Sequence, residues 1–320
     1  MSTVTTEVPT PAVLRPEALR STGVDVLETV AGYSRVLDDV RRSGRSVGVV
    51  PTMGALHAGH RSLVERAARE CDVVAVSIFV NPTQFGDAAD LALYPRTLEA
   101  DLEAVAQAGG RLVFAPSVAE MYPEGPNEVP MVSAPELADR WEGASRPGHF
   151  DGVATVVVKL LSAAGACRAY FGEKDFQQLA LVRRVVRDRS LPTEVIGCET
   201  VRQRDGLALS SRNTRLSAEE RRAALVLSRA LRSGASMMAG GEDRPSVIEE
   251  EMTRVVAGEP AVALDYAALV HADDLEPAST CATSRPLRLL IAAEVGPVRL
   301  IDNLDPRGWA PIPALGRLSA

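Results

Sequence analysis

The fold of this chain is decided by residues 46–85, at whose centre stands Pro51-Thr52-Met53-Gly54-Ala55-Leu56-His57-Ala58-Gly59-His60. The apolar run 47–50 predicts a buried strand that stops at Pro51. Residues 61–70 have helical periodicity, with Leu63, Val64, Ala67 and Ala68 expected on one face, and the apolar run 73–80 predicts a second strand. Strand, helix and strand at this length form a βαβ unit, so we expect the two strands to be parallel.

Both histidines of this segment are expected where such units bind ligands, beyond the carboxyl ends of the strands. His57 and His60 flank the start of the helix, where unpaired backbone N–H groups and the helix dipole favour an anion. Gly54 and Gly59 allow the backbone to approach a guest closely. Two imidazoles can also donate hydrogen bonds to phosphoryl oxygens as charge builds on a leaving group. The segment therefore predicts phosphate chemistry on a nucleotide.

Two other interpretations of the histidine pair remain open at this point, namely ordinary surface residues and half of a zinc site. The zinc interpretation lacks a His-Glu-x-x-His arrangement and a nearby cysteine cluster. This segment also lacks the two motifs that mark other phosphate-binding loops, Gly-x-x-x-x-Gly-Lys-Ser/Thr and Gly-x-Gly-x-x-Gly.

Composition limits the class of protein. The 320 residues are enough for two domains, and 35 basic against 42 acidic residues give a net charge of −7, which argues against a nucleic-acid-binding surface. The amino-terminal residues do not resemble a secretion signal, and no apolar run is long enough for a membrane span. The four cysteines form no Cys-x-x-Cys pair, so we expect free thiols and a cytoplasmic protein: Cys71, Cys167, Cys198 and Cys281.

The chain divides into a flexible tail (1–20), a Rossmann-like, doubly wound α/β domain with a parallel sheet (21–200) and a smaller α+β domain (201–320) that closes over the nucleotide. Further helices are expected at 24–42, 98–108, 153–164, 176–189, from a capping box at Ser217 to Glu220, and at 246–257. Further strands are expected at 111–115, 168–171, 194–198, 264–270, 287–293 and 298–301. The proline-rich stretch 116–135 should be irregular.

Several segments carry a resemblance. His57-Ala58-Gly59-His60 resembles the His-x-Gly-His signature of the nucleotidyltransferase superfamily, and the longer string 50–60, followed by Phe79-Val80-Asn81-Pro82-Thr83-Gln84-Phe85, resembles the pantothenate synthetase family. Similar segments continue to about residue 305, at 146–153, at Gly172-Glu173-Lys174-Asp175 and at Leu209-Ser210-Ser211-Arg212, where leucine replaces the family's methionine.

The resemblance implies a set of site residues. His60, His57 and Lys174 would be catalytic, and Gln84 and Gln178 would bind pantoate. The ATP-binding positions would be Met53, Gly54, Ala55, Leu56, His57, Ala58, Gly59, His60, Gly172, Glu173, Lys174, Asp175, Val201, Leu209, Ser210, Ser211 and Arg212.

The residue types suit that chemistry. Lys174 offers a point charge, and Ser210, Ser211 and Arg212 offer hydroxyls and a guanidinium fork for phosphate oxygens. No covalent nucleophile stands out, so direct displacement is expected. By resemblance, pantoate would attack ATP to give a pantoyl adenylate, and β-alanine would convert it to pantothenate and AMP. Mg²⁺ is expected with ATP, but its protein ligands stay open, with Asp175 and Asp101 as candidates.

Other functions remain possible on the residues alone. The chain could be a different adenylyltransferase, a non-catalytic nucleotide-binding protein or the core of an RNA-binding synthetase. The acidic balance argues against RNA. We expect the protein to bind small-molecule substrates and to bind neither nucleic acid nor a membrane. The resemblance also implies a homodimer.

Overall fold

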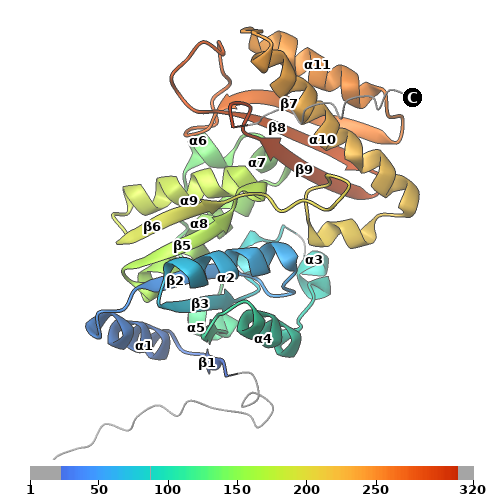
Figure 1. The fold of residues 1–320 in the computed structure, drawn as a ribbon. Helices are drawn as coiled ribbons and strands as arrows, with labels where there is room; N and C mark the ends of the chain where they lie inside the picture. The colour runs from blue at the N-terminus through green and yellow to red at the C-terminus, as the bar shows by residue number, and fades with distance from the viewer. Residues whose placement is uncertain (1–22, 87, 309–320) are drawn as a thin grey trace, which may run out of the picture. The chain divides into compact units, whose positions relative to one another are not determined.

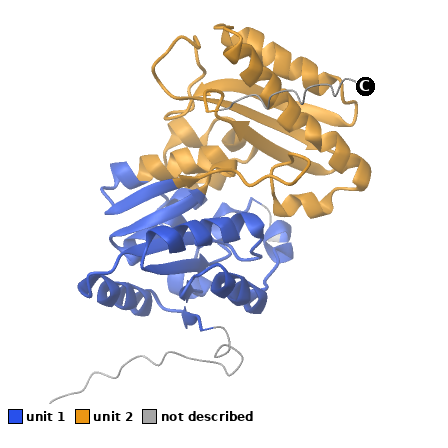
Figure 2. Ribbon diagram, viewed as in Figure 1, with its two compact units in different colours: residues 1–132, 152–171, 186–196 blue, residues 133–151, 172–185, 197–320 orange. Residues whose placement is uncertain are grey.

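The computed structural model describes residues 23–86 and 88–308, so the predicted tail lies outside the described residues. The chain forms two compact units that alternate along the sequence (Figure 2). Unit 1 contains residues 1–132, 152–171 and 186–196, and unit 2 contains residues 133–151, 172–185 and 197–320. The predicted domain boundary near residue 200 stays a prediction.

Unit 1 is built on a six-stranded sheet with the order β1-β4-β3-β2-β5-β6 (Figure 1). Its strands are β1 (Asp25–Leu27), β2 (Val47–Thr52), β3 (Val73–Ile78), β4 (Leu112–Phe114), β5 (Cys167–Gly172) and β6 (Thr193–Cys198). Strands β2 and β3 pair in parallel over their whole length, from Val47 opposite Val73 to Thr52 opposite Ile78, and β2 pairs in parallel with β5 on its other side. The predicted doubly wound parallel sheet is confirmed, and its chain order reverses at β2.

Helices flank this sheet. They are α1 (Val30–Arg42), α2 (Ala58–Glu70), the 3-10 helix η2 (Pro82–Gln84), α3 (Ala88–Leu93), α4 (Leu98–Gln107), α5 (Val118–Met121) and α8 (His149–Ala164), which begins in unit 2. Helix α2 buries Leu63, Val64 and Ala67 as predicted, whereas Ala68 is exposed. It approaches β2 so closely that a Cβ on Gly48 would lie 3.3 Å from Ala67 and Cys71.

Unit 2 combines short and long helices with a small antiparallel sheet, β7-β8-β9. Its elements are α6 (Pro135–Ala138), α7 (Glu142–Ser145), the 3-10 helices η3 (Glu173–Asp175) and η4 (Ser211–Arg215), α9 (Phe176–Asp188), which ends in unit 1, α10 (Ala218–Ala239), α11 (Pro245–Ala257), β7 (Val262–His271), β8 (Leu287–Val295) and β9 (Val298–Leu304). The predicted capping box at Ser217 and Glu220 starts α10. Helices α10 and α11 cover the sheet with buried Leu227, Leu231 and Met252. In the described parts of both units, none of the helices has the length and apolar character needed to cross a bilayer.

Two predicted elements need correction. Residues 25–27 are not the start of a helix but an edge strand that pairs with β4. The N–H of Asp25 donates to the carbonyl of Arg111, just before β4, and the carbonyl of Leu27 accepts from the N–H of Ala115, just after it. The helix α1 begins only after Thr29, whose hydroxyl accepts a hydrogen bond from the N–H of Gly32. Within the stretch expected to be irregular, Ser117 caps the four-residue helix α5 by accepting from the N–H of Glu120.

The turn after β2 is shorter and more tightly held than its sequence indicates. Strand β2 continues through Pro51 to Thr52, and α2 starts at Ala58 instead of Arg61. Between them Gly54 and Ala55 both have left-handed backbone angles, φ +84° and +52°. A Cβ on Gly54 would lie 3.0 Å from the carboxylate of Asp101, which explains the glycine.

Asp101 fastens this turn from helix α4. Its two carboxylate oxygens accept hydrogen bonds from the N–H groups of Ala55 (3.0 Å) and Leu56 (2.7 Å), and the hydroxyl of Thr97 donates a third at 3.2 Å. Asp101 is only 2 % exposed. A left-handed alanine costs about 1–2 kcal/mol, so these charge-assisted bonds offset the strain of the turn.

We expect Asp101→Asn to lower the free energy of unfolding by about 1–3 kcal/mol, because the amide has one accepting oxygen where the carboxylate has two. Urea unfolding followed by circular dichroism measures this change. Glu103→Gln removes the same charge from an exposed position of α4 and is the matched control. Equal stability losses in the two variants would refute the fastening role of Asp101.

Candidate active site

The two histidines of the β2–α2 turn form one hydrogen-bonded pair. Their rings stack with centroids 4.1 Å apart. The Nδ1 atom of His57 accepts from the N–H of Gly59 (3.1 Å), and the Nδ1 atom of His60 accepts from the N–H of His57 (3.4 Å). A backbone N–H can only donate, so each neutral ring carries its proton on Nε2. The turn therefore fixes both imidazoles as Nε2–H donors.

Several backbone N–H groups at the helix start are already used within the turn. Those of Gly54, Ala55, Leu56, His57 and Gly59 bond to protein atoms. The expected anion at the start of the helix stays a prediction, and the imidazole N–H groups are donors that suit it.

A buried amide network orients Gln84 in unit 1. The side-chain oxygen of Gln84 accepts from Asn81 (3.1 Å), and its NH₂ group contacts the sulfur of Met53 at 2.9 Å. Asn81 is 1 % exposed and also receives the hydroxyl of Tyr122 at 2.7 Å. The structure thus brings together two predicted site residues, Met53 and Gln84. The roles of Asn81 and Tyr122 as their supports were missed, since Tyr122 lies 41 residues along the chain from Asn81.

Gly152 closes this network from the start of helix α8. Its carbonyl accepts from the Asn81 amide at 3.1 Å. A Cβ at this position would lie 2.3 Å from the carbonyl oxygen of Thr83 and 2.7 Å from the backbone nitrogen of Gln84. Only glycine permits this approach, which explains its place after the His149-Phe150-Asp151 segment.

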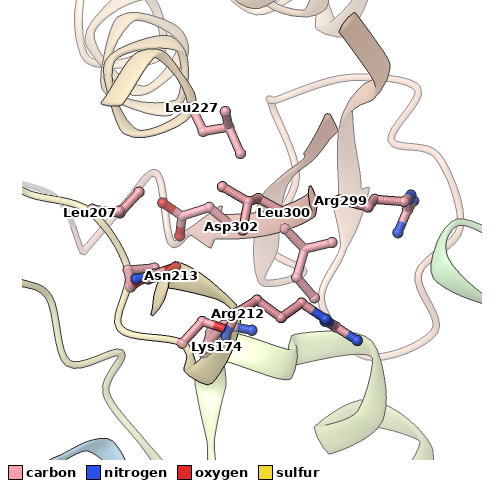
Figure 3. A pocket seen from close by; sticks show the side chains of 11 residues that line it. Lys174, Leu207, Arg212, Asn213, Leu227, Arg299, Leu300 and Asp302 are labelled. Carbon is pink, nitrogen blue, oxygen red and sulfur yellow. The ribbon is translucent and has the colours of Figure 1, made fainter. Parts of the chain in front are cut away.

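The other predicted residues lie in unit 2. Lys174, Ser210 and Arg212 line one pocket together with Asn213, Arg299 and Asp302 (Figure 3). Apolar side chains from α10 and β9, Leu227 and Leu300, also line it. The structure therefore brings the Gly-Glu-Lys-Asp segment and the Ser-Ser-Arg segment, which are far apart in sequence, to one pocket.

Backbone bonds shape the segment that carries Ser210 and Arg212. The N–H of Leu209 donates to the carbonyl of Val201 at 2.9 Å, which places these two predicted positions side by side. Ser210 caps η4 by accepting from the N–H of Arg212 at 3.3 Å. Ser211 is exposed, and Gln178 lies half-buried on α9.

Positive charge gathers near the pocket beyond the predicted residues. Burial lowers the pKa of Arg146, and the nearby charge of Arg212 lowers it further, while Glu142 and Asp175 act in the opposite direction. A buried guanidinium whose charge is disfavoured by a second guanidinium nearby is typical of an anion site. Arg146 belongs to the Arg-Pro-Gly-His-Phe segment, which resembles the family. Its role was missed, because the resemblance assigned no function to this arginine.

The two acidic residues considered as magnesium ligands, Asp101 and Asp175, differ in their contacts and exposure. Asp101 uses its oxygens on the β2–α2 turn, as described above. Asp175 lies 3.0 Å from the ammonium group of Lys174 and is 49 % exposed. Glu173, which was not a candidate, pairs with Arg288 at 2.9 Å. In the ranges 23–86 and 88–308, no three His, Cys, Asp or Glu side chains form a group that could hold a metal ion.

One known protein family matches most of this chain. The model of the pantoate-beta-alanine ligase family matches residues 25–305. Pantothenate synthetase from Rubrobacter xylanophilus is 51% identical over 268 residues, which are 82% of this chain and 92% of that protein. Pantothenate synthetase from a Chelativorans species is 50% identical over 281 residues, covering 88% of this chain and 97% of that protein.

Solved structures agree. Pantothenate synthetase from Thermus thermophilus superposes with a TM-score of 0.80 at 46% identity and covers 88% of this chain and 99% of its own. Pantoate-beta-alanine ligase from Francisella tularensis, solved in complex with beta-gamma ATP and beta-alanine, has a TM-score of 0.70 at 33% identity, covering 89% and 99%. This chain belongs to the pantoate-beta-alanine ligase family.

Proposed function

We propose that this protein condenses pantoate with β-alanine in a reaction driven by ATP, forming pantothenate, AMP and pyrophosphate through a pantoyl adenylate. The observation that carries the proposal is the His57–His60 pair, whose tautomers are fixed by the turn between two parallel strands of a chain in this ligase family. Histidines fixed as donors suit the stabilisation of a phosphate leaving group.

In the first step, a carboxylate oxygen of pantoate attacks the α-phosphorus of ATP. The bond between that phosphorus and the bridging oxygen to the β-phosphate breaks, and pyrophosphate leaves with the electron pair. His60 is the main donor to the leaving group, with His57 beside it. Lys174, Ser210, Ser211 and Arg212 bind phosphate oxygens, and direct attack needs no enzyme nucleophile.

In the second step, the amine of β-alanine attacks the acyl carbon of the adenylate. The new C–N bond forms as the C–O bond to the phosphate breaks, and AMP leaves. Gln84 and Gln178 bind pantoate through their amides, and Gln84 also meets β-alanine. Met53 and Val201 lie in the ATP-binding set, with Val201 against the adenine or ribose.

Magnesium is proposed to arrive with ATP. There it would neutralise phosphate charge, and because Mg²⁺ usually keeps several waters and substrate phosphate oxygens as ligands, one exposed carboxylate would be sufficient protein support. Asp175 fits this requirement, because it is half-exposed and next to Lys174. We further propose a homodimer in the cytoplasm. The cytoplasmic assignment is supported by the four cysteines, which form no disulfide bond with one another.

Reactions with single omissions test the proposal directly. ATP, pantoate and β-alanine together should yield AMP, pyrophosphate and pantothenate, measured by phosphorus NMR and mass spectrometry. ATP with pantoate alone should support exchange of labelled pyrophosphate into ATP, because the first step is reversible while β-alanine is missing. Product formation that does not depend on pantoate would instead indicate another adenylyltransferase.

We expect His60→Asn and His60→Ala to reduce the rate of adenylation alike, by roughly 10²-fold or more. Asparagine keeps an oxygen where Nδ1 accepts from His57 but cannot supply the Nε2–H donor. Only His60→Ala should therefore also lower the melting temperature. Single-turnover release of pyrophosphate and thermal unfolding measure the two effects, and near-normal release by His60→Asn would remove His60 from the leaving-group role.

Gln84→Glu should raise the KM for pantoate about tenfold or more, because the new carboxylate repels the carboxylate of the substrate and loses the amide donor. Its volume is nearly unchanged, so the KM for ATP should stay close to the wild-type value. Gln107→Glu makes the same chemical change on helix α4, away from the Gln84 network, and serves as the control. Equal changes in both KM values would contradict a specific contact with pantoate.

A further inference from the structure

We infer that Asn303, a buried residue of β9, is a positioning residue that fixes Lys174 by holding the two peptide groups on either side of it. The inference rests on the proposed function, in which Lys174 binds phosphate oxygens. It goes further by assigning a role to the small antiparallel sheet, whose residues were not among the predicted site residues.

The backbone on both sides of Lys174 is held by a single amide of the sheet. The NH₂ group of Asn303 donates to the carbonyl oxygens of Glu173 and Lys174, at 2.9 Å each. These carbonyls belong to the peptide groups immediately before and after the α-carbon of Lys174. Both backbone angles of Lys174 are therefore tied to β9, and the direction in which its side chain leaves the backbone is set.

The orientation of the Asn303 amide is itself fixed by an arginine. Its oxygen accepts from Nε of Arg288 at 2.8 Å, and a guanidinium can only donate. The NH₂ group must then face the two carbonyls. Arg288 also pairs with the carboxylate of Glu173 at 2.9 Å and lies over the ring of Phe176, 4.2 Å from its centroid. Residues on both sides of Lys174 are thus held by the same guanidinium.

Burial makes this set of contacts rigid. Asn303 is 3 % exposed and Arg288 is 8 % exposed. The neighbouring residue, Asp302, receives the N–H of Asn303 at 2.7 Å and two hydrogen bonds from Arg202 at 2.7 and 2.8 Å. Breaking any of these contacts leaves a buried polar group without its partner, which is costly.

Such a clamp matters because lysine is a long and flexible side chain. Lys174 has an 18 % exposed side chain, and its ammonium group lies 3.0 Å from Asp175 at the pocket that also holds Arg212 (Figure 3). Its reach to a phosphate depends on where its backbone stands. A displacement of about 1 Å can cost up to about 10²-fold in rate.

Asn303→Asp tests the inference with almost no change in volume. The carboxylate still accepts from Arg288, but it cannot donate to the two carbonyls and repels them. We expect kcat for adenylation to fall about tenfold or more. In a Lys174→Ala background, the same substitution should lower kcat by less than about twofold, because two residues that act through one group are not additive.

A merely structural role of Asn303 predicts a different result, namely the same fold-change in kcat in both backgrounds. That result would overturn the inference. Glu249→Ala is the matched control for lost stability, since Glu249 accepts the N–H of Leu269 from the same sheet without touching residues 173–175. Its kcat should stay within about twofold of wild type. Asn303→Ala, which also lacks the donor, repeats the cycle if the aspartate variant does not fold.

A measurement without substrate separates this inference from the proposed function. The chain contains only two lysines, Lys159 and Lys174, so protein labelled with ¹³C at lysine Cε gives two side-chain signals. Asn303→Asp should shift the Lys174 signal, while that of Lys159, which lies over the ring of Tyr122 in unit 1, should not move. An unmoved Lys174 signal would contradict the clamp. A wild-type protein that makes no pantothenate would contradict the proposed function alone.

Discussion

The parallel pairing of β2 with β3 is the constraint on which unit 1 depends. Each residue of β2 from Val47 to Thr52 is paired with its counterpart in β3, so β2 must end at the carboxyl edge of the sheet and the chain must turn there into α2. The turn needs left-handed backbone at Gly54 and Ala55, and Asp101 supplies the hydrogen bonds that hold it. The orientation of the two histidines follows from that turn, because their Nδ1 atoms accept its backbone N–H groups.

Unit 2 also holds a predicted site residue through its backbone, but with different groups. In unit 1 the carboxylate of Asp101 holds the turn that carries the histidines, and in unit 2 the amide of Asn303 holds the peptide groups around Lys174. In both units the side chain proposed to meet substrate is held by a buried polar residue from a distant part of the chain. Buried polar groups of this kind are costly unless fully bonded, and here their bonds also define the geometry of the site.

The choice of lysine at position 174 is informative in this chain. Only two of its 35 basic residues are lysines, so arginine is the usual cation here. An ammonium group is a compact point charge that can follow phosphate oxygens as charge moves between them, whereas the guanidinium of Arg212 offers a planar fork. Lys174 and Arg212 therefore differ in the geometry that they can recognise.

The order of residues was enough to predict the βαβ unit, the parallel sheet, three strands of the α+β domain, the capping box at Ser217 and the family, because periodicity, caps and motifs are local properties of the chain. It did not reveal the edge strand at Asp25–Leu27, since a three-residue strand exists only through its partner β4. Nor did it reveal how the site is held. Asp101 lies 46 residues from Ala55, and Asn303 lies 130 residues from Glu173. Such contacts depend on how distant segments pack, so they became visible only in the folded chain.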